Sequence, residues 1–527
     1  MLAILLTQLA AHACGGFFCN NNEPVDQSAE RILFSHDLST GEVEAHVQIF
    51  YSGPSEGFAW VVPVPSEPEI FLSSDQLFTD LSNAYRATFS LVREEEEWCT
   101  PEPWDYSGLN GGGGYNEPEP APTVEVVASD SVGPYDTVTL KAETSDGLID
   151  WLQDNGFDLP DELSAALDPY IGDNLFVAMK LTKDAAEGSV QPIGLRYTST
   201  GLSVPIQLTS IAAQPDMRVE AYVLGDFRAV PGSYLHVQIN EAAIDWFHPD
   251  GRYEQAVSRA ANEAGGHAFA TDYSGAATMP FRQLYTSSYY DTGAIAAATT
   301  AADAMEAVMG QFQPTGLVQQ TLIEFMPPPP DVEPDWFYNC VSCYVSDDYP
   351  FDGPGLAAAL EERIVVPRAH LGDLFERFDH LTVLTSSLDA AEMTVDPTFV
   401  FNRDMVQEVD SEHYATLRFL CGEGGREDLS PRQLVLADGR TFDLPSEDYL
   451  ERTGQSEADM LKPESHPAAI VIEVTSGTEE PITLADYREE GAAGSEQAKG
   501  CGCATSSSPA AILAWLAPLM GWLRRRG

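Results

Sequence analysis

The alternation of apolar and polar residues near the start of the chain is the feature that most constrains its fold. Residues 42–51 read Glu-Val-Glu-Ala-His-Val-Gln-Ile-Phe-Tyr, and this two-residue period is typical of a strand that is buried on one face. The pattern predicts a three-stranded antiparallel meander over about 30–36, 42–51 and 57–64, with Pro63 and Pro65 suited to a sheet edge or a strand end. It places His46 on the polar face, as a surface residue.

Further strands and helices are predicted along the whole body of the chain. Short segments rich in β-branched and aromatic residues predict strands, and Asp438-Gly439 between two of them predicts a hairpin with a type I′ turn. The predicted fold class is α+β and β-rich, with antiparallel sheets, a few short helices and a C-terminal hydrophobic sorting helix. The other predicted strands are 124–127, 135–140, 174–183, 190–197, 202–211, 217–224, 233–239 and 468–475, and the predicted helices are part of 70–92, 146–154, 252–263, 294–310, 355–363 and 370–379.

A run of four prolines, Pro327 to Pro330, followed by acidic residues up to Asp335, predicts a stiff extended linker. The 527 residues are enough for several domains. We therefore predict one or more β-rich domains over 14–326 and a second α+β domain over 336–487. A Gly/Pro-rich surface loop is expected at 105–122 and a spacer at 488–508.

The charge balance is strongly acidic. Lys and Arg number 27 against 82 Asp and Glu, a net charge of −55. Such a body repels nucleic acid and anionic membrane surfaces, which excludes both as main partners. The acidic residues are spread along the chain, so a solvated acidic surface explains most of them, and an irregular calcium site formed by acidic loops stays open as an alternative.

Both ends of the chain carry processing signals. Residues 1–13 are apolar and end in Ala11-His12-Ala13, a small-x-small pattern that predicts signal-peptide cleavage after Ala13. Acylation of Cys14, as in a lipoprotein, is the alternative. The last residues combine Cys501-Gly502-Cys503, an apolar run over 509–523 and the basic end Arg524-Arg525-Arg526.

The apolar run at the C-terminus is short for a permanent membrane anchor. Its 15 residues span roughly 22 Å as a helix at about 1.5 Å per residue, against a hydrocarbon core of about 30 Å. Pro518 and Gly521 weaken the helix further. We predict a short transmembrane segment that is recognised and cut rather than kept.

Eight cysteines in an exported chain point first to disulfides. For the Cys340-x-x-Cys343 pair, a zinc site or a redox site stays open beside the structural disulfide. The two cysteines of the C-terminal motif are assigned to processing. The disulfide candidates are Cys14, Cys19, Cys99, Cys340, Cys343 and Cys421.

No catalytic, cofactor-binding or metal-binding set can be named from local motifs. Gly53-Pro-Ser-Glu-Gly57 matches the G-x-S-x-G nucleophile elbow, but a strand rather than a helix is predicted to follow, so a turn explains it better. His267 is a possible ligand without a partner nearby in the sequence. The acidic loop 348–353 fails the EF-hand template.

Two resemblances bear on these patterns. The tail, Cys501-Gly502-Cys503 with its apolar run and Arg524-Arg525-Arg526, resembles the MYXO-CTERM sorting signal of myxobacterial surface proteins. That resemblance implies cleavage near the cysteine motif by a membrane protease and delivery to the outer surface.

The body resembles the DUF2330 family of exported bacterial proteins, which have no established activity. The matching segments are Ala13 to Cys19, Phe58 to Pro65, Asp245-Trp246 with 260–269, and 381–402. The family brings no catalytic residues to transfer.

These observations predict an exported protein of the outer membrane or cell surface, whose partners are the export machinery and a C-terminal sorting protease. Contact with the membrane is expected through the C-terminal segment or a lipid. A non-enzymatic envelope or surface-interaction role is the leading hypothesis, and no cofactor is expected other than calcium. The alternative is a secreted hydrolase or metal-dependent enzyme whose site is assembled from distant residues.

Overall fold

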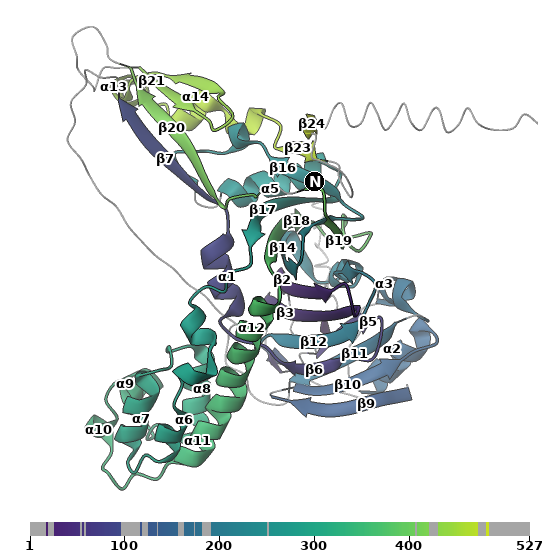
Figure 1. Ribbon diagram of the computed structural model, residues 1–527, viewed down its shortest axis with the longest axis vertical. Coiled ribbons are helices and arrows are strands. Elements are labelled where there is room, and N and C mark those ends of the chain that lie inside the picture. The colour runs from purple at the N-terminus through teal and green to yellow at the C-terminus, as the bar shows by residue number, and fades with distance from the viewer. Residues whose placement is uncertain are drawn as a thin grey trace, which may run out of the picture. The chain divides into compact units, whose positions relative to one another are not determined.

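A computed structural model shows two large sheets, several small ones and a group of helices (Figure 1). The residues that the structure describes all belong to one compact unit, which ends at Thr483. The residues that the structure describes are 17–18, 26–52, 55–56, 59–95, 116–117, 125–133, 135–155, 163–172, 174–181, 191–249, 252–405, 408–420, 431–472 and 481–483.

The largest sheet of the described residues has ten strands. Its pairs are antiparallel except for β14 with β2 and β16 with β17, which are parallel. In spatial order the strands are β24 (Pro481–Thr483), β23 (Ala469–Ile472), β16 (Leu235–Ile239), β17 (Ala268–Ala276), β18 (His380–Leu388), β14 (Ala213–Gly225), β2 (Asp26–Asp37), β3 (Glu42–Ser52), β12 (Ile193–Thr198) and β6 (Glu69–Leu72).

The second large sheet has five strands and packs against one face of the first. Val62, Val64 and Val177 share a core with Ile32 and Val43 of the ten-stranded sheet. In spatial order its strands are β1 (Phe17–Phe18), β5 (Ala59–Val64), β11 (Leu175–Leu181), β10 (Tyr135–Lys141) and β9 (Glu125–Val132). The smaller sheets are β13 (Leu202–Ser203) with β19 (Thr398–Asn402) and β15 (Arg228–Pro231); β22 (Thr441–Leu444) with β21 (Arg432–Val435), β20 (Glu412–Phe419) and β7 (Thr88–Glu95); and β4 (Ser55–Glu56) with β8 (Asn116–Glu117).

Helices are more extensive than the few short ones predicted. A group of six, α6 to α11, surrounds an apolar core that includes Ile295, Leu322 and Phe337. Side chains such as Thr300 and Thr315 accept hydrogen bonds from first-turn N–H groups, which satisfies donors that have no partner within the helix. The helices are α1 (Leu77–Tyr85), α2 (Ser145–Asp154), α3 (Leu163–Leu167), α4 (Ile206–Thr209), α5 (Arg252–Glu263), α6 (Thr292–Ala296), α7 (Ala301–Met309), α8 (Gly316–Phe325), α9 (Pro334–Asn339), α10 (Val341–Tyr344), α11 (Gly353–Leu360), α12 (Val366–Arg377), α13 (Glu447–Thr453) and α14 (Glu457–Leu461).

The two faces of the ten-stranded sheet are both covered. On β2, Ile32 and Phe34 point into the core shared with the five-stranded sheet, whereas Leu33 points to the other face and packs with residues of α1 and α12. Successive side chains of a strand alternate between faces. This central part of the sheet is therefore buried on both sides, and a polar residue there can lie inside the protein on either face.

Several predictions about the fold require correction. Strands β2 and β3 form the predicted hairpin, but β5 belongs to the other large sheet, so the meander is wrong. Strand β5 lies between β1 and β11 in its sheet, so it is not an edge strand. Strand β1 pairs only with Ala59 and Trp60, however, and not with Pro63. The hairpin β21–β22 is confirmed, although Gly439 is left-handed and Asp438 is not, which excludes a type I′ turn.

The predicted division at 327–335 is not a boundary in the structure. Strands β18 and β23 follow this segment in sequence, yet they pair with β14, β17 and β16, which precede it. The prolines lead into α9 and the helical core instead. The predicted Gly/Pro-rich loop and spacer lie mostly or wholly outside the described residues.

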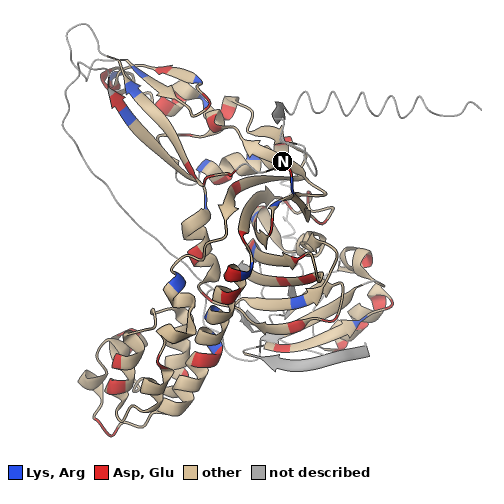
Figure 2. Ribbon diagram, viewed as in Figure 1, with Lys and Arg blue, Asp and Glu red and all other residues tan. Residues whose placement is uncertain are grey.

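Acidic residues are distributed over strands and helices alike (Figure 2). None of the described helices is both long enough and apolar enough to cross a membrane. The predicted signal peptide, residues 1–13, and the tail, residues 501–527, lie outside the described residues.

Candidate metal centre

Strand β3 carries Glu44 and His46 on one face of the ten-stranded sheet. Two residues apart on a strand, their side chains point the same way. His46 pairs in register with Leu33, whose face is covered by α1 and α12. Glu44 and His46 are accordingly only 1% and 0% exposed, so the prediction of His46 as a surface residue is wrong.

Helix α12 lies beside β3 (Figure 1) and brings a second histidine to this face. His370 Nε2 lies 2.5 Å from Glu44 Oε1, and His46 Nε2 lies 2.9 Å from the same oxygen. One potential ligand atom from each of the three residues falls within 4.8 Å of the other two. The His370 side chain is 30% exposed, so the cluster reaches solvent on the α12 side.

The other polar atoms of Glu44 and His46 are held by neighbours. His46 Nδ1 lies 2.7 Å from Ser73 Oγ, and Arg196 on β12 places Nε and a terminal nitrogen each 3.0 Å from Glu44 Oε2. Phe71 packs edge-on against both histidine rings. These contacts fix the ring of His46 and leave its Nε2, together with Glu44 Oε1, for the cluster.

The charges of the cluster follow from burial and hydrogen bonding. Burial raises the pKa of Glu44, but the hydrogen bonds from His370 and His46 outweigh it and hold the pKa well below its usual range. Burial lowers the pKa of His46 more than the neighbouring Glu44 raises it. At neutral pH the cluster therefore contains an ionised carboxylate and, at His46, a neutral imidazole.

Two imidazole nitrogens and one carboxylate oxygen form a donor set that suits a transition-metal ion. Zn²⁺ prefers such ligands, and catalytic zinc sites use three protein ligands and leave a fourth position open. Tetrahedral bonds of about 2.0–2.1 Å to the metal separate the ligand atoms from one another by roughly 3.3 Å. The two histidine nitrogens lie 2.5 and 2.9 Å from Glu44 Oε1, so each would move away from this oxygen by less than about 1 Å when an ion binds. The Ser73 and Arg196 contacts correspond to the outer-shell partners that orient metal ligands.

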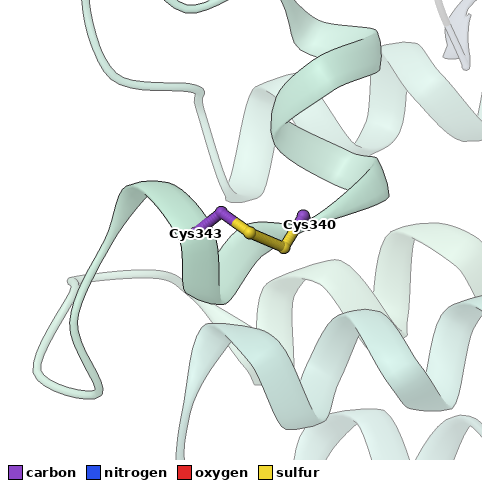
Figure 3. The surroundings of a disulfide bond; sticks show 2 residues. All are labelled: Cys340 and Cys343. Atoms are coloured by element: carbon purple, nitrogen blue, oxygen red, sulfur yellow. A yellow bond between two sulfur atoms is a disulfide. The ribbon is translucent and has the colours of Figure 1, made fainter.

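The residues singled out in the sequence lie elsewhere. Cys340 and Cys343 form a disulfide in the helical group, at the start of α10 (Figure 3). This bond agrees with the predicted disulfide. The other predicted disulfide and processing residues lie outside the described residues: Cys14, Cys19, Cys99, Cys421, Ala13, Cys501, Gly502, Cys503, Arg524, Arg525 and Arg526.

The remaining candidates have structural roles. His267 Nε2 lies 2.9 Å from the carbonyl oxygen of Glu392 and 3.0 Å from Thr394 Oγ1. Asp352, in the acidic loop, caps α11 by accepting from the Gly355 N–H. Ser55 lies in β4, and the next element of the chain is the strand β5, so the strand-to-helix turn of a nucleophile elbow is not formed there.

Comparison with known proteins identifies the family. A family model described as an uncharacterized protein conserved in bacteria (DUF2330) matches residues 8–282, which is more than half of the 527 residues. The chain belongs to the DUF2330 family. Glu44, His46, Ser73 and Arg196 lie within the matched segment, and His370 lies beyond it. No curated protein and no solved structure matches this DUF2330 protein.

Proposed function

We propose that this DUF2330 protein is an exported protein of the cell envelope that binds Zn²⁺ at Glu44, His46 and His370. The observation that carries the metal assignment is the convergence of two histidine Nε2 atoms on a single buried carboxylate oxygen. The amphipathic patterns of β3 and α12 do not require a glutamate or histidine at these three positions. An ion pair that only stabilises the fold would need no more than the contact between Arg196 and Glu44.

Metal binding is expected to be lost when His370 is replaced by alanine. His370 is the most exposed of the three ligands, so this variant is the least disruptive to folding. After chelator treatment, the wild-type chain should take up one equivalent of Zn²⁺, measured by elemental analysis and by competition with a chromogenic chelator. H370A should bind at least about 100-fold more weakly, beyond the 10–100-fold typical of outer-shell partners.

His248 offers a matched control, because its side chain is 70% exposed and forms an ion pair with Asp245 outside the metal centre. H248A should bind Zn²⁺ as the wild type does. Co²⁺ in place of Zn²⁺ should give the visible absorption of a tetrahedral site in wild type and H248A and not in H370A. Equal zinc uptake by wild type and H370A would contradict the assignment, leaving the cluster as a hydrogen-bonded ion-pair network.

A metal-dependent hydrolase is the second candidate function. Three protein ligands leave a coordination position for water, and the partial exposure of His370 opens the cluster to solvent on one side. A zinc-bound water has a pKa near 7 and is a strong nucleophile at neutral pH. Hydrolysis of activated ester or phosphoester probes by the zinc-loaded chain, lost in H370A and kept in H248A, would favour this function over metal binding alone.

Export and surface sorting are supported by the sequence at both ends of the chain. The small-x-small pattern ending at Ala13 and the tail Cys501-Gly502-Cys503 with its basic end carry this part of the proposal. Mass spectrometry of the protein from its native envelope should find neither residues 1–13 nor Arg524-Arg525-Arg526. Protease added to intact cells should digest it. Recovery of both intact ends would refute the proposed processing.

A further inference from the structure

A second candidate site lies beside β16 and β17, which are near one end of the ten-stranded sheet, whereas β3 is near the other end. A cavity of about 490 Å³ is lined by residues of β16, β17, β20 and the segment 408–410. This volume is within the range of small-molecule sites in proteins. Its lining contains none of the residues of the metal centre, so the two sites can be tested separately.

The buried part of the cavity contains a histidine with an unused polar atom. His236 is 3% exposed and lines the cavity. Its Nε2 lies 2.8 Å from Thr271 Oγ1, whereas its Nδ1 has no hydrogen-bond partner among the described residues. A buried polar atom without a partner costs free energy. The position is therefore suited to a ligand that forms the missing hydrogen bond.

A cation lies in the same buried part of the lining. Arg228 is 2% exposed and lines the cavity with His236. Burial, and to a lesser extent the charge of Arg228, lowers the pKa of His236 to about 3, so the imidazole is neutral. If Thr271 donates to Nε2, then Nδ1 carries the proton and points a donor toward the ligand. Guanidinium and N–H donor together favour an anionic group at this end.

The outer part of the cavity has the opposite charge. Glu408, Asp410 and Glu412 are exposed and belong to its lining, and with Glu241 the lining contains four carboxylates. Phe89 and Tyr253 also belong to the lining, and their ring centroids are 5.2 Å apart. The cavity thus offers hydrogen-bond donors at its buried end and carboxylates at its exposed end, with aromatic side chains in its lining.

We propose that this cavity binds a small amino carboxylate, that is, an amino acid or short peptide with separated charges. Its carboxylate faces Arg228 and His236 Nδ1, its apolar body lies against Phe89 and Tyr253, and its ammonium group lies among the exposed carboxylates. A ligand with only one of the two charges satisfies only one end of the cavity.

The full-length protein is tested by calorimetric titration with 6-aminohexanoate, which separates an ammonium from a carboxylate by five methylene groups. Hexanoate lacks the ammonium and hexylamine lacks the carboxylate, and each should bind at least about tenfold more weakly, as expected for the loss of a charged hydrogen-bonding group. Hexylamine binding as tightly as 6-aminohexanoate, or no binding of 6-aminohexanoate at 10 mM, would overturn the proposal.

Two variants locate the site. In H236Q the glutamine amide can still hydrogen-bond to Thr271, as Nε2 of His236 does. The variant has no group in place of Nδ1, so binding of 6-aminohexanoate should weaken about tenfold or more. E408Q removes one exposed carboxylate and should weaken it about threefold to tenfold, with less risk to folding because Glu408 is exposed. The control is E306Q, which removes an exposed carboxylate from α7. If E306Q and E408Q lost the same affinity for 6-aminohexanoate, the loss would reflect the net charge of the protein and not a contact in the cavity, and this would contradict the proposal.

Discussion

Replacement of Arg368 by methionine is expected to lower the free energy of unfolding by about 3–5 kcal/mol, because removal of one partner leaves a buried charge uncompensated. Arg368, on α12, is 1% exposed and is one of the largest fully buried side chains described. It donates to Tyr290 Oη at 2.9 Å and lies 3.4 Å from Asp75 Oδ1. Asp80 is also close enough for its pKa to be lowered by this cation, against the larger effect of burial.

The double variant R368M/D75N separates charge from packing. If the loss in R368M arises from the stranded carboxylate of Asp75, neutralising that carboxylate should restore most of it, since buried ion pairs can often be replaced by neutral groups at little cost. Chemical denaturation followed by tryptophan fluorescence measures both variants. A double variant as unstable as R368M would show that Arg368 acts through its packing in the core and its hydrogen bond to Tyr290.

Asp272 is expected to make the protein less stable as the pH rises from about 4 to 7. It lies on β17 where the pairing with β18 shifts register, it is 2% exposed, and it accepts a hydrogen bond from the hydroxyl of Tyr253. Burial raises the pKa of Asp272 to about 7, although the Tyr253 bond and Arg218 act against this. In the unfolded chain an aspartate has a pKa of about 3.9.

The sign of the effect follows from proton binding. Between about pH 4 and 7 the native state keeps a proton that the unfolded state has released, so stability falls as pH rises through this interval and levels off above it. The variant D272N has no such proton and should gain up to about 3–4 kcal/mol relative to wild type between pH 4 and 7.5. Denaturation at a series of pH values, with the exposed-site variant D150N as control, measures this difference. A constant difference between D272N and wild type across the interval would contradict a raised pKa.

Local elements of the fold were predictable from the sequence, because short-range periodicity and turn chemistry determine them. Helix α5 begins and ends where its pattern predicts, at Arg252 and Glu263, and β10 and β11 lie within about two residues of their predicted ranges. The predicted strand 202–211 is an exception. It consists of the two-residue β13 followed by α4, which begins after Pro205, a residue that cannot donate to a sheet.

The candidate metal centre was not predictable by the same reasoning. Glu44 and His46 alternate with apolar residues, and this pattern is typical of a strand with one solvent face. Only the packing of α12, more than 300 residues later in the sequence, turns that polar face into an interior. The local signal in the sequence was a glutamate and a histidine two residues apart on a predicted strand. These two residues indicate a metal site only together with His370, and no sequence spacing connects His370 to them.

The order of strands in the largest sheet also bears on how the chain reaches its destination. Strand β2 pairs with β14 about 190 residues later, β14 pairs with β18 about 170 residues further on, and β16 pairs with β23 near residue 470. Such distant pairings form slowly, because the entropy of closing a long loop is lost before the contacts between the strands contribute favourable free energy. The sheet cannot be completed until nearly the whole body has left the ribosome. For the export proposed here, this delay leaves β2 unpaired with β14 while the chain is still being synthesised, so that the large sheet can be completed after transport.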